Sequence, residues 1–441
     1  MRNFTFKGLF LTAVFALLWS LTIQAADDGL ITKQITIKLK EAGTLPDRID
    51  ASKKYLITNL KLVGEINGTD FRMIREMAGS DYYGGSTEGN LSVLDLSEAK
   101  IVIGGGDYFN GYSCYTSNDV IGNRAFNGCS RLTSLTLPAS ITRIGDYAFY
   151  CCSGLTSLTL PAGITEIGYS AFCGCSGLTS LNLPAGITSI GDDAFYGCSG
   201  LTSITLPAGI TEIGGSAFNG CSRLTSLTLP AGITSIGGGA FYGCSGLTSL
   251  NLPAGITEIG GGAFGFCSGL TSINLPAGIT SIGEYAFYGC SGLTSVTLPA
   301  GITEIGECAF YGCSGLTSLT LPAGLTQIDD YAFSECSGLT SIYVYAEKVP
   351  KIGEDVFKGC EAKKCILYVP KGTYDDYCLS EFRYFENIVE FDATGIDKTT
   401  TSTDVEEVSR YSVNGQRLVG PTKGLNIVKY SDGSVKKVAV E

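Results

Sequence analysis

The sequence predicts a β-rich right-handed solenoid of 23-residue units, with an N-terminal cap and a small β unit at the C-terminal end. Cysteine and phenylalanine each recur ten times at a spacing of 23 residues, and a leucine pattern keeps step with them. One unit of this length cannot bury its apolar side alone, so neighbouring units must stack into a shared core. The repeated residues are Cys129, Cys152, Cys175, Cys198, Cys221, Cys244, Cys267, Cys290, Cys313 and Cys336, with phenylalanines from Phe126 to Phe333.

Each unit has the pattern C-S-x-L-T-S-L-x-L-P-A-G-I-T-x-I-G-x-x-A-F-x-G. In the first full copy, the spacing of Leu135 and Leu137 places both on one face of a short strand. Pro138 ends that strand, because proline cannot donate to a sheet ladder. Ile144 carries a second short extended segment, and Phe149 returns the chain to the core.

This unit resembles the leucine-rich repeat, specifically the 23-residue BspA-like type of surface proteins from oral and gut anaerobic bacteria. The resemblance runs from Leu91 to about Phe391. It implies an extracellular location and adhesion to host proteins or to other bacteria.

The first 26 residues are typical of a secretory signal peptide. Arg2 and Lys7 supply positive charge, residues 8–21 are apolar, and Ala25–Ala26 offers a small-residue cleavage site. A retained membrane anchor is the alternative. No later apolar stretch is long enough to cross a bilayer, so we expect no integral membrane span after signal removal.

Residues 27–90 are expected to form the N-terminal cap, with a strand at 34–40 and a short helix at 71–77. Residues 91–391 then form the solenoid and its C-terminal cap. The first repeat carries an insertion of about 18 residues that is rich in aromatic side chains. These either seal the end of the core or form an aromatic contact patch, and they are Tyr108, Phe109, Tyr112 and Tyr115.

Beyond the solenoid, residues 392–408 are polar and threonine-rich and are expected to be a linker. Residues 409–441 predict a small β unit, with hairpin turns at Asn414–Gly415 and Asp432–Gly433. The segment GLNIVKYSDGSVKKVAVE resembles the C-terminal sorting domains of type IX secretion substrates, which leaves the export route open.

The composition disfavours several classes of function. The 441 residues include 42 acidic and 30 basic ones, a formal net charge of −12, so nucleic acid is not an expected partner. Histidine is absent, which removes Ser–His–Asp and Cys–His nucleophile pairs and histidine-containing zinc sites. We expect no catalytic residues, no metal and no cofactor.

Seventeen cysteines in an exported chain would usually suggest disulfides. We expect the ten repeat cysteines to form a buried ladder instead, since a free thiol behaves as a small apolar group. Cys360, Cys365 and Cys378 fall outside that spacing, and a Cys360–Cys365 disulfide is an open alternative. The neighbouring carboxylates Asp192–Asp193 and Asp329–Asp330 could suggest a glycosidase, but adjacent turn residues rarely converge on one substrate.

The outward position of the first strand forms a stripe of neutral hydroxyl and amide side chains. Such residues suit any exposed strand. The alternative is a ligand-binding surface on the concave sheet, as solenoids commonly use. The stripe residues are Thr136, Thr159, Asn182, Thr205, Thr228, Asn251, Asn274, Thr297 and Thr320. Four tyrosines recur every 46 residues, and they either form a sparse aromatic row on the outer side or pack against neighbouring turns: Tyr150, Tyr196, Tyr242 and Tyr288.

These features favour a secreted or outer-surface binding protein, monomeric, that displays its repeats to host extracellular proteins, glycans or other cells. The alternative is a structural spacer or cell-envelope component without a specific host ligand. A carbohydrate hydrolase is the third and least favoured hypothesis.

Overall fold

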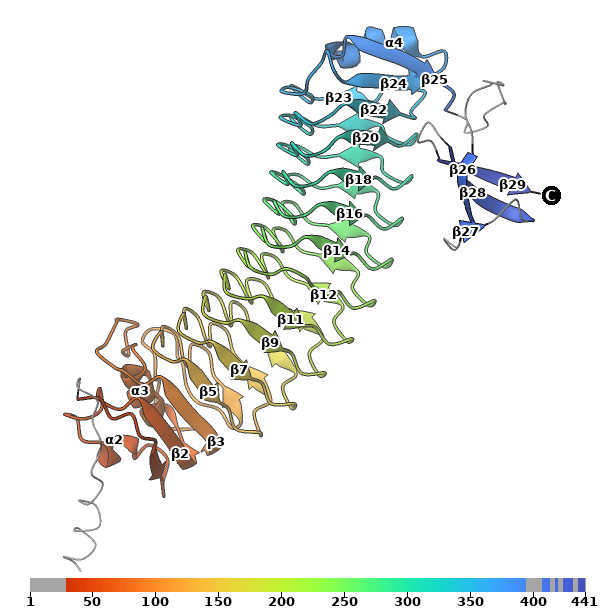
Figure 1. Cartoon of the computed structure of the whole chain (residues 1–441). Coiled ribbons are helices and arrows are strands. Elements are labelled where there is room, and N and C mark those ends of the chain that lie inside the picture. Colours follow the sequence, from red (N-terminus) through yellow and green to blue (C-terminus); the bar gives the residue numbers. More distant parts are fainter. Residues whose placement is uncertain (1–28, 394–406, 413–416, 419–422, 431–434, 441) are drawn as a thin grey trace, which may run out of the picture. The chain divides into compact units, whose positions relative to one another are not determined.

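The computed structural model describes residues 29–393, 407–412, 417–418, 423–430 and 435–440. The chain divides into two compact units, Met1–Phe391 and Asp392–Glu441. The first is a β-solenoid, as the repeat pattern predicts (Figure 1). The predicted signal peptide, both predicted hairpin turns and most of the predicted linker lie outside the described residues.

Each turn of the solenoid except the one that contains residues 226–228 contributes one short strand to what we call the front row. Neighbouring strands are parallel and in register, so that Leu135 faces Leu158 in the next turn. Apolar side chains alternate with polar ones along these strands, which buries one face and exposes the other. The strands are β5 (Ser134–Thr136), β7 (Ser157–Thr159), β9 (Ser180–Asn182), β11 (Ser203–Thr205), β14 (Ser249–Asn251), β16 (Ser272–Asn274), β18 (Ser295–Thr297), β20 (Ser318–Leu321), β22 (Ser341–Val344) and β24 (Ile366–Pro370).

A second set of two-residue strands forms the back row, parallel and in register within three sheets, with one isoleucine per turn that is buried at every position except Ile352. Proline separates the two rows within each turn, as expected. The back-row strands are β4 (Val120–Ile121), β6 (Arg143–Ile144), β8 (Glu166–Ile167), β10 (Ser189–Ile190), β12 (Glu212–Ile213), β13 (Ser235–Ile236), β15 (Glu258–Ile259), β17 (Ser281–Ile282), β19 (Glu304–Ile305), β21 (Gln327–Ile328) and β23 (Lys351–Ile352).

The turn edge is the third side of each turn; it follows the back-row strand and includes residues 145–151 and their equivalents. Here the amide of each core phenylalanine donates to the carbonyl of an alanine in the next turn, as Phe126 does to Ala148 at 2.7 Å. The same bond recurs in every turn up to Phe310, which bonds Ala332 at 2.8 Å. The turn edge therefore carries an unbroken backbone ladder along the array.

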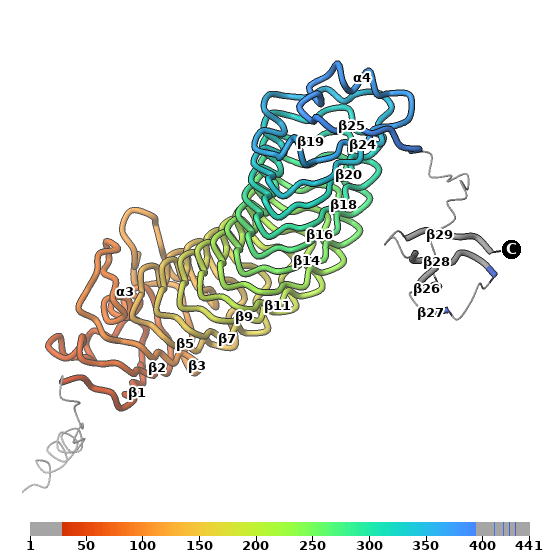
Figure 2. Tube along the Cα trace, turned by 45° about the horizontal axis from the view of Figure 1, so that its top comes forward, coloured from red at the N-terminus to blue at the C-terminus, as the bar shows by residue number. Residues whose placement is uncertain are grey.

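The core consists of side-chain ladders that run along the stack of turns shown in Figure 2. The phenylalanine rings stack face to face from Phe126 to Phe357, with centroids 5.4 Å apart for the pair Phe195–Phe218. The repeat cysteines are buried and free, as predicted. Each thiol after the first donates to a phenylalanine carbonyl of the preceding turn, as Cys244 does to Phe218 at 3.1 Å.

The front row, unlike the turn edge, is interrupted: its strands fall into four sheets, with breaks between β7 and β9, between β11 and β14, and between β18 and β20. The widest break lies between β11 and β14, where a strand is missing. Residues 226–228 form no strand, and β11 and β14 lie on either side of them in separate sheets. Within the described array, Thr225 lacks the backbone bond to the preceding turn that Thr202 makes to Thr179 at 2.9 Å. A recess of about 500 Å³ opens there between neighbouring turns.

The N-terminal cap covers one end of the core with β1 (Ile35–Lys38), α2 (Leu45–Arg48), β2 (Asn59–Ile66), α3 (Gly68–Met77) and β3 (Val93–Ile101). Strand β1 and helix α3 occupy the predicted positions. Asn67 caps α3, and the buried Asp70 carboxylate accepts from the amides of Asn67 and Leu45 at 2.9 Å each. This capping box fixes the start of the helix against the first turns.

The C-terminal cap contains α4 (Tyr374–Cys378), a short 3₁₀ helix η1 (Glu381–Tyr384) and β25 (Asn387–Phe391), which extends the front row beside β24. The buried Tyr377 hydroxyl donates to the Ala346 carbonyl at 2.6 Å and ties the cap to the last turns. Among the described residues, none of the helices could cross a bilayer.

The second unit is a four-stranded antiparallel sheet with strand order β27-β26-β28-β29. Its strands are β26 (Glu407–Ser412), β27 (Arg417–Leu418), β28 (Gly424–Tyr430) and β29 (Val435–Val440). A small β unit is therefore present where the sequence predicts one, and its first strand begins at Glu407, within the predicted linker.

Candidate binding surfaces

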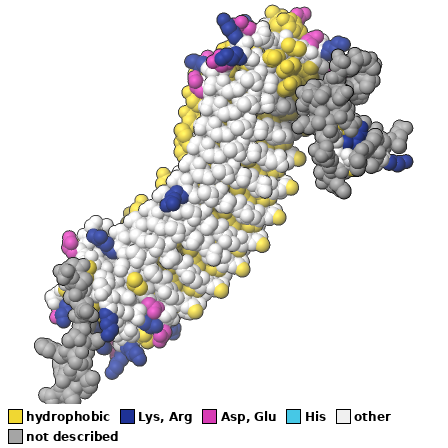
Figure 3. Space-filling model, in the orientation of Figure 1, with side chains coloured by type: hydrophobic (Ala, Val, Ile, Leu, Met, Phe, Trp, Pro, Cys, Tyr) yellow, Lys and Arg dark blue, Asp and Glu magenta, His cyan; other side chains and the backbone are white. Residues whose placement is uncertain are grey.

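The stripe predicted from the sequence lies along the front row, and all nine of its side chains, from Thr136 to Thr320, are exposed. In Figure 3 the array shows a mainly uncharged polar face, with most charged side chains near its two ends. Arg223 is the only lysine or arginine between residues 144 and 347. The stripe is interrupted at Thr228, where the front-row ladder is broken.

A second threonine row, three residues before each stripe residue, has a structural role. The Thr156 hydroxyl donates to the Thr133 carbonyl at 3.0 Å, and Thr202 bonds Thr179 in the same way. These hydroxyls reinforce the contact between turns. The stripe is not the only exposed part of the front row, because threonines such as Thr156 and serines such as Ser157 are exposed as well.

The four aromatic residues of the insertion do not form one surface patch. Tyr108 and Phe109 are buried, with 0% and 7% of their surface exposed, and Tyr108 packs against Phe71 of α3. Tyr112 and Tyr115 are exposed, at 60% and 55%. The insertion thus seals the core with its first aromatic pair, and only the second pair faces solvent.

The tyrosines at a spacing of 46 residues lie on the turn edge. Tyr196 and Tyr242 are exposed, whereas Tyr150 and Tyr288 are half-buried. The sequence reasoning missed their partners, because these occupy variable turn positions without a regular period. The signal that could have found them is their place one or two residues before an A-F pair, as in Tyr147, Tyr169 and Tyr285.

These added tyrosines complete two aromatic clusters. In the first, the Tyr147 ring lies edge-on to Tyr150 and Tyr169, with centroids 5.7 and 5.2 Å away. Together with Tyr196 and Asp193 they line a recess of about 280 Å³. The second cluster contains Tyr242, Phe266, Tyr285, Tyr288 and Tyr311.

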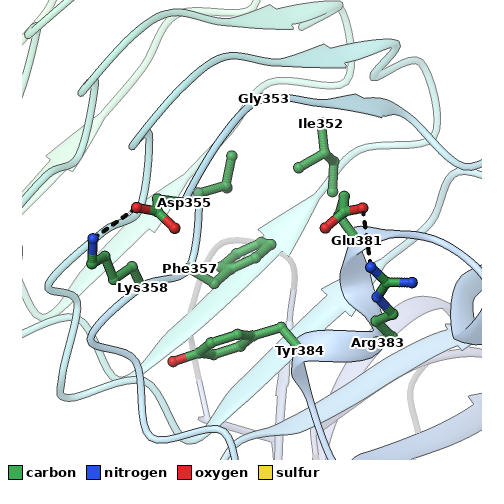
Figure 4. A pocket seen from close by; sticks show the side chains of 9 residues that line it. Ile352, Gly353, Asp355, Phe357, Lys358, Glu381, Arg383 and Tyr384 are labelled. Atoms are coloured by element: carbon green, nitrogen blue, oxygen red, sulfur yellow. Dashed lines mark hydrogen bonds and ion pairs between the residues drawn. The ribbon is translucent and has the colours of Figure 1, made fainter.

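A further recess, of about 230 Å³, lies between the last turn and the C-terminal cap (Figure 4). Its charged groups already pair with one another: Lys358 bonds Asp355 at 2.7 Å, and Arg383 lies 3.7 Å from Glu381. Phe357, which ends the stack of rings, also lines it. This recess is best explained by the closure of the core.

The carboxylate pairs do not converge. Asp192 accepts from the Gly215 amide at 2.6 Å, whereas Asp193 accepts from the Tyr169 hydroxyl at 2.7 Å. In the other pair, Asp329 bonds the Gln327 amide and Asp330 bonds the Glu354 backbone. Each carboxylate therefore orients a different neighbouring group.

The thiols fall into two groups. Burial raises the pKa of Cys198, Cys244 and Cys290 to about 12, so these thiols are neutral and inert near pH 7. Cys360, placed outside the ladder by its spacing, in fact continues it, because its thiol donates to the Phe333 carbonyl at 3.4 Å. Cys360 and Cys365 are both free, which leaves the disulfide alternative unsupported. Among the described cysteines, only Cys151 is exposed.

Among the described residues, no group of three or more cysteine, aspartate or glutamate side chains could hold a metal ion. The stacked parallel strands, the buried leucine and phenylalanine ladders and the exposed polar rows define the first unit as a leucine-rich-repeat solenoid.

The family described as "BspA type Leucine rich repeat region" matches the chain in six copies, over residues 113–199, 165–291 and 257–388. These matches span more than half of the chain, and the protein therefore belongs to the BspA-type leucine-rich-repeat family.

The chain is similar to solved structures. A leucine-rich repeat protein from Bacteroides ovatus ATCC 8483 is 24% identical, with a TM-score of 0.54, over 84% of this chain and 94% of that one. A leucine rich cell surface protein from Faecalibacterium prausnitzii A2-165 is 25% identical, with a TM-score of 0.42, over 83% and 92% of the two chains. No curated protein matches the chain.

Proposed function

We propose that the protein is a secreted or cell-surface binding protein that uses its solenoid in adhesion to host extracellular proteins, glycans or other cells. The observation that carries the proposal is the stripe: nine neutral polar side chains, all exposed, repeated in register along the front row. Membership of the BspA-type family supports it. The signal-peptide pattern of residues 1–26 and the sorting-like pattern of residues 409–441 support export.

A neutral face of this kind suits binding rather than catalysis. Threonine and asparagine offer hydrogen bonds, but they lack the aromatic or arginine anchors that dominate tight interfaces. Each turn would contribute little, and affinity would accumulate along the array by avidity.

The test is binding of the full-length protein to immobilised matrix proteins and to a glycan array. The triple variant Thr205→Lys, Asn251→Lys and Asn274→Lys places three charges on the stripe and should weaken binding at least tenfold. The matched control, Ser189→Lys with Ser281→Lys, adds charges to exposed back-row positions and should leave binding unchanged. Equal binding by both variants would exclude the stripe as the contact surface.

A structural spacer in the cell envelope is the second candidate, favoured by the regularity of the array. Deletion of residues 199–244, two whole repeats, separates the candidates. Avidity predicts a graded loss of binding, whereas a spacer keeps its binding and changes only its reach. Antibody labelling of intact cells then tests display, because an envelope component would be labelled only after the outer membrane is opened.

A further inference from the structure

The turn edge combines aromatic faces with carboxylates. Along this side, Asp193 accepts from Tyr169 of the first aromatic cluster, and Glu307 accepts from Tyr285 of the second. Asp192 precedes Asp193 in the chain, and Glu284 precedes Tyr285. Residues 144–347 are all described, and within them the only cation, Arg223, lies in the segment leading to the front row. The turn edge of these repeats is therefore acidic and contains no lysine or arginine to neutralise it.

The chain itself shows what this edge can hold. At its N-terminal end the Arg124 guanidinium lies between two tyrosine rings, 3.9 Å from the centroid of Tyr112 and 4.2 Å from that of Tyr147. Phe109 lies below it at 5.5 Å. A guanidinium over the face of an aromatic ring is attracted by the ring's quadrupole, and more strongly where water is excluded. The opposite neighbours of Tyr147 are Tyr150 and Tyr169, which line the next recess.

That recess offers hydrogen-bond acceptors and aromatic faces. Asp193 accepts from the Tyr169 hydroxyl at 2.7 Å, which fixes both groups at the rim and raises the pKa of Tyr169 to about 12. The lining includes Ser170 and Cys173 and no cationic side chain. A group that donates hydrogen bonds and carries positive charge complements this lining better than a neutral or acidic group does.

The second cluster repeats the arrangement. The Tyr285 hydroxyl donates to the Glu307 carboxylate of the next turn at 3.0 Å, as Tyr169 does to Asp193. Five turns separate the two pairs, which corresponds to roughly 24 Å along the stack. A single extended segment of a partner could span this distance.

The recess walls are held by the unbroken ladder of the turn edge. The Tyr147 amide bonds the Tyr169 carbonyl at 2.9 Å, and the Gly174 amide bonds the Tyr196 carbonyl at 2.7 Å. Because this backbone is already ordered, little backbone entropy is lost on binding, which favours affinity.

We infer that the turn edge is a docking surface for a basic protein segment, with one arginine or lysine side chain of the partner held at each aromatic cluster. The inference rests on the proposed binding function but assigns it a second surface and a partner class. The contact of Arg124 with Tyr112 and Tyr147 is an example, within this chain, of how the partner's side chain would be held. The carboxylates that no lysine or arginine neutralises would attract the basic segment over a longer range.

The test uses the full-length protein and a fluorescent twelve-residue peptide of alternating arginine and glycine. A peptide with citrulline in place of arginine keeps the shape and removes the charge. We expect saturable binding of the arginine peptide and at least tenfold weaker binding of the citrulline peptide. Equal binding of the two peptides, or no binding of either, would overturn the inference.

Variants locate the contact. Tyr169→Ala and Asp193→Asn should each raise the Kd for the arginine peptide at least fivefold, whereas Glu258→Gln, which removes an exposed back-row charge, should change it less than twofold. Equal effects of Asp193→Asn and Glu258→Gln would show diffuse electrostatics and no site. Thermal melting confirms that each variant is folded. The lysine-substituted stripe variant should bind the peptide with no more than a twofold change, so the two surfaces can fail separately.

Discussion

The front row and the turn edge are built from the same 23-residue unit, yet they differ in what they keep constant. The front row repeats its exposed side chains almost without change, but its backbone ladder is broken around residues 226–228. The turn edge varies its exposed side chains from turn to turn, while its backbone ladder is continuous. Chemical regularity and structural continuity therefore lie on different sides of the solenoid.

The difference has a physical cause. The front row depends on polar strands three residues long, with few bonds per turn, whereas the turn edge lies directly over the stacked phenylalanines and the thiol ladder. Burial of a phenylalanine stabilises by about 1.5–3 kcal/mol, more than a typical net hydrogen bond of about 1 kcal/mol. The side of the turn that contains Phe218 and Cys221 should therefore tolerate variation at its surface better than the front row does.

The largest effect is expected from alkaline pH, which should lower the free energy of unfolding by ionising the buried thiols on the turn-edge side. Burial raises the pKa of Cys198, Cys244 and Cys290 from an ordinary value near 9 to about 12. Each thiol thus contributes stability that is complete below pH 9 and is lost as the pH rises toward 12. The unfolding free energy should fall by about 1.4 kcal/mol per pH unit for each of them.

Urea unfolding between pH 8 and pH 11, under reducing conditions, measures this slope. A variant with serine at all three positions keeps the hydrogen-bond donor and removes the titrating group, so its slope should be shallower. If the wild-type protein and the serine variant had the same slope, the thiols would already be ionised or exposed in the native protein.

Phe218→Ala should cost about 3–5 kcal/mol, because it removes one ring from the stack and leaves a cavity that the neighbouring turns cannot fill. Thr228→Ala, at an exposed front-row position, should change stability by less than about 0.5 kcal/mol. Urea denaturation of the two variants gives the comparison directly. Similar losses would show that the two sides contribute alike.

Amide hydrogen exchange should distinguish the turn edge from the interrupted part of the front row without any mutation. The amides of Phe195 and Phe218 lie in the unbroken ladder, at 2.8 Å from their acceptors. They should exchange at least roughly tenfold more slowly than the amides of residues 226–228. Equal protection of the two segments, measured by mass spectrometry of overlapping peptides, would contradict the interruption of the front row.

The smallest effect is expected at Cys151. It occupies a turn position with φ of +55°, where the following turns have Gly174, Gly197 and Gly220 at φ of +67° to +75°. Cys151→Gly should relieve backbone strain and stabilise the protein by about 1 kcal/mol. Gly197→Ala, whose added Cβ meets no atom closer than 3.8 Å, should lower stability by a similar amount through backbone conformation alone. Differential scanning calorimetry would detect both shifts, and shifts of the same sign would refute this account.

The sequence alone predicts the solenoid well, because the same residue types recur at the same positions of every 23-residue unit. Cys244, Phe218 and Leu250 recur at fixed spacing and occupy the core as expected. The exposure of the stripe follows from the alternation of side chains along a strand. These features depend only on the unit, and every copy of the unit confirms the others.

Features that depend on contacts between non-equivalent residues could not be predicted. Tyr108 and Phe109 look like Tyr112 and Tyr115 in the sequence, and only the packing against α3 and the first turn separates them. Cys360 is one residue out of step, and only the stacking of the last turn shows that it rejoins the thiol ladder. Tyr147 and Tyr169 are neighbours because turns stack, which no periodicity reveals.

The interruption of the front row also has a mechanical consequence. Around Leu227 the two neighbouring turns are joined by their back-row strands and by the bond from Phe218 to Ala240, with no front-row strand to brace them. Under tension along the solenoid, the front side should open more readily here than at a turn whose front-row strand is present, while the opposite side acts as a hinge. A tethered protein could yield elastically there before any turn of its core unravelled.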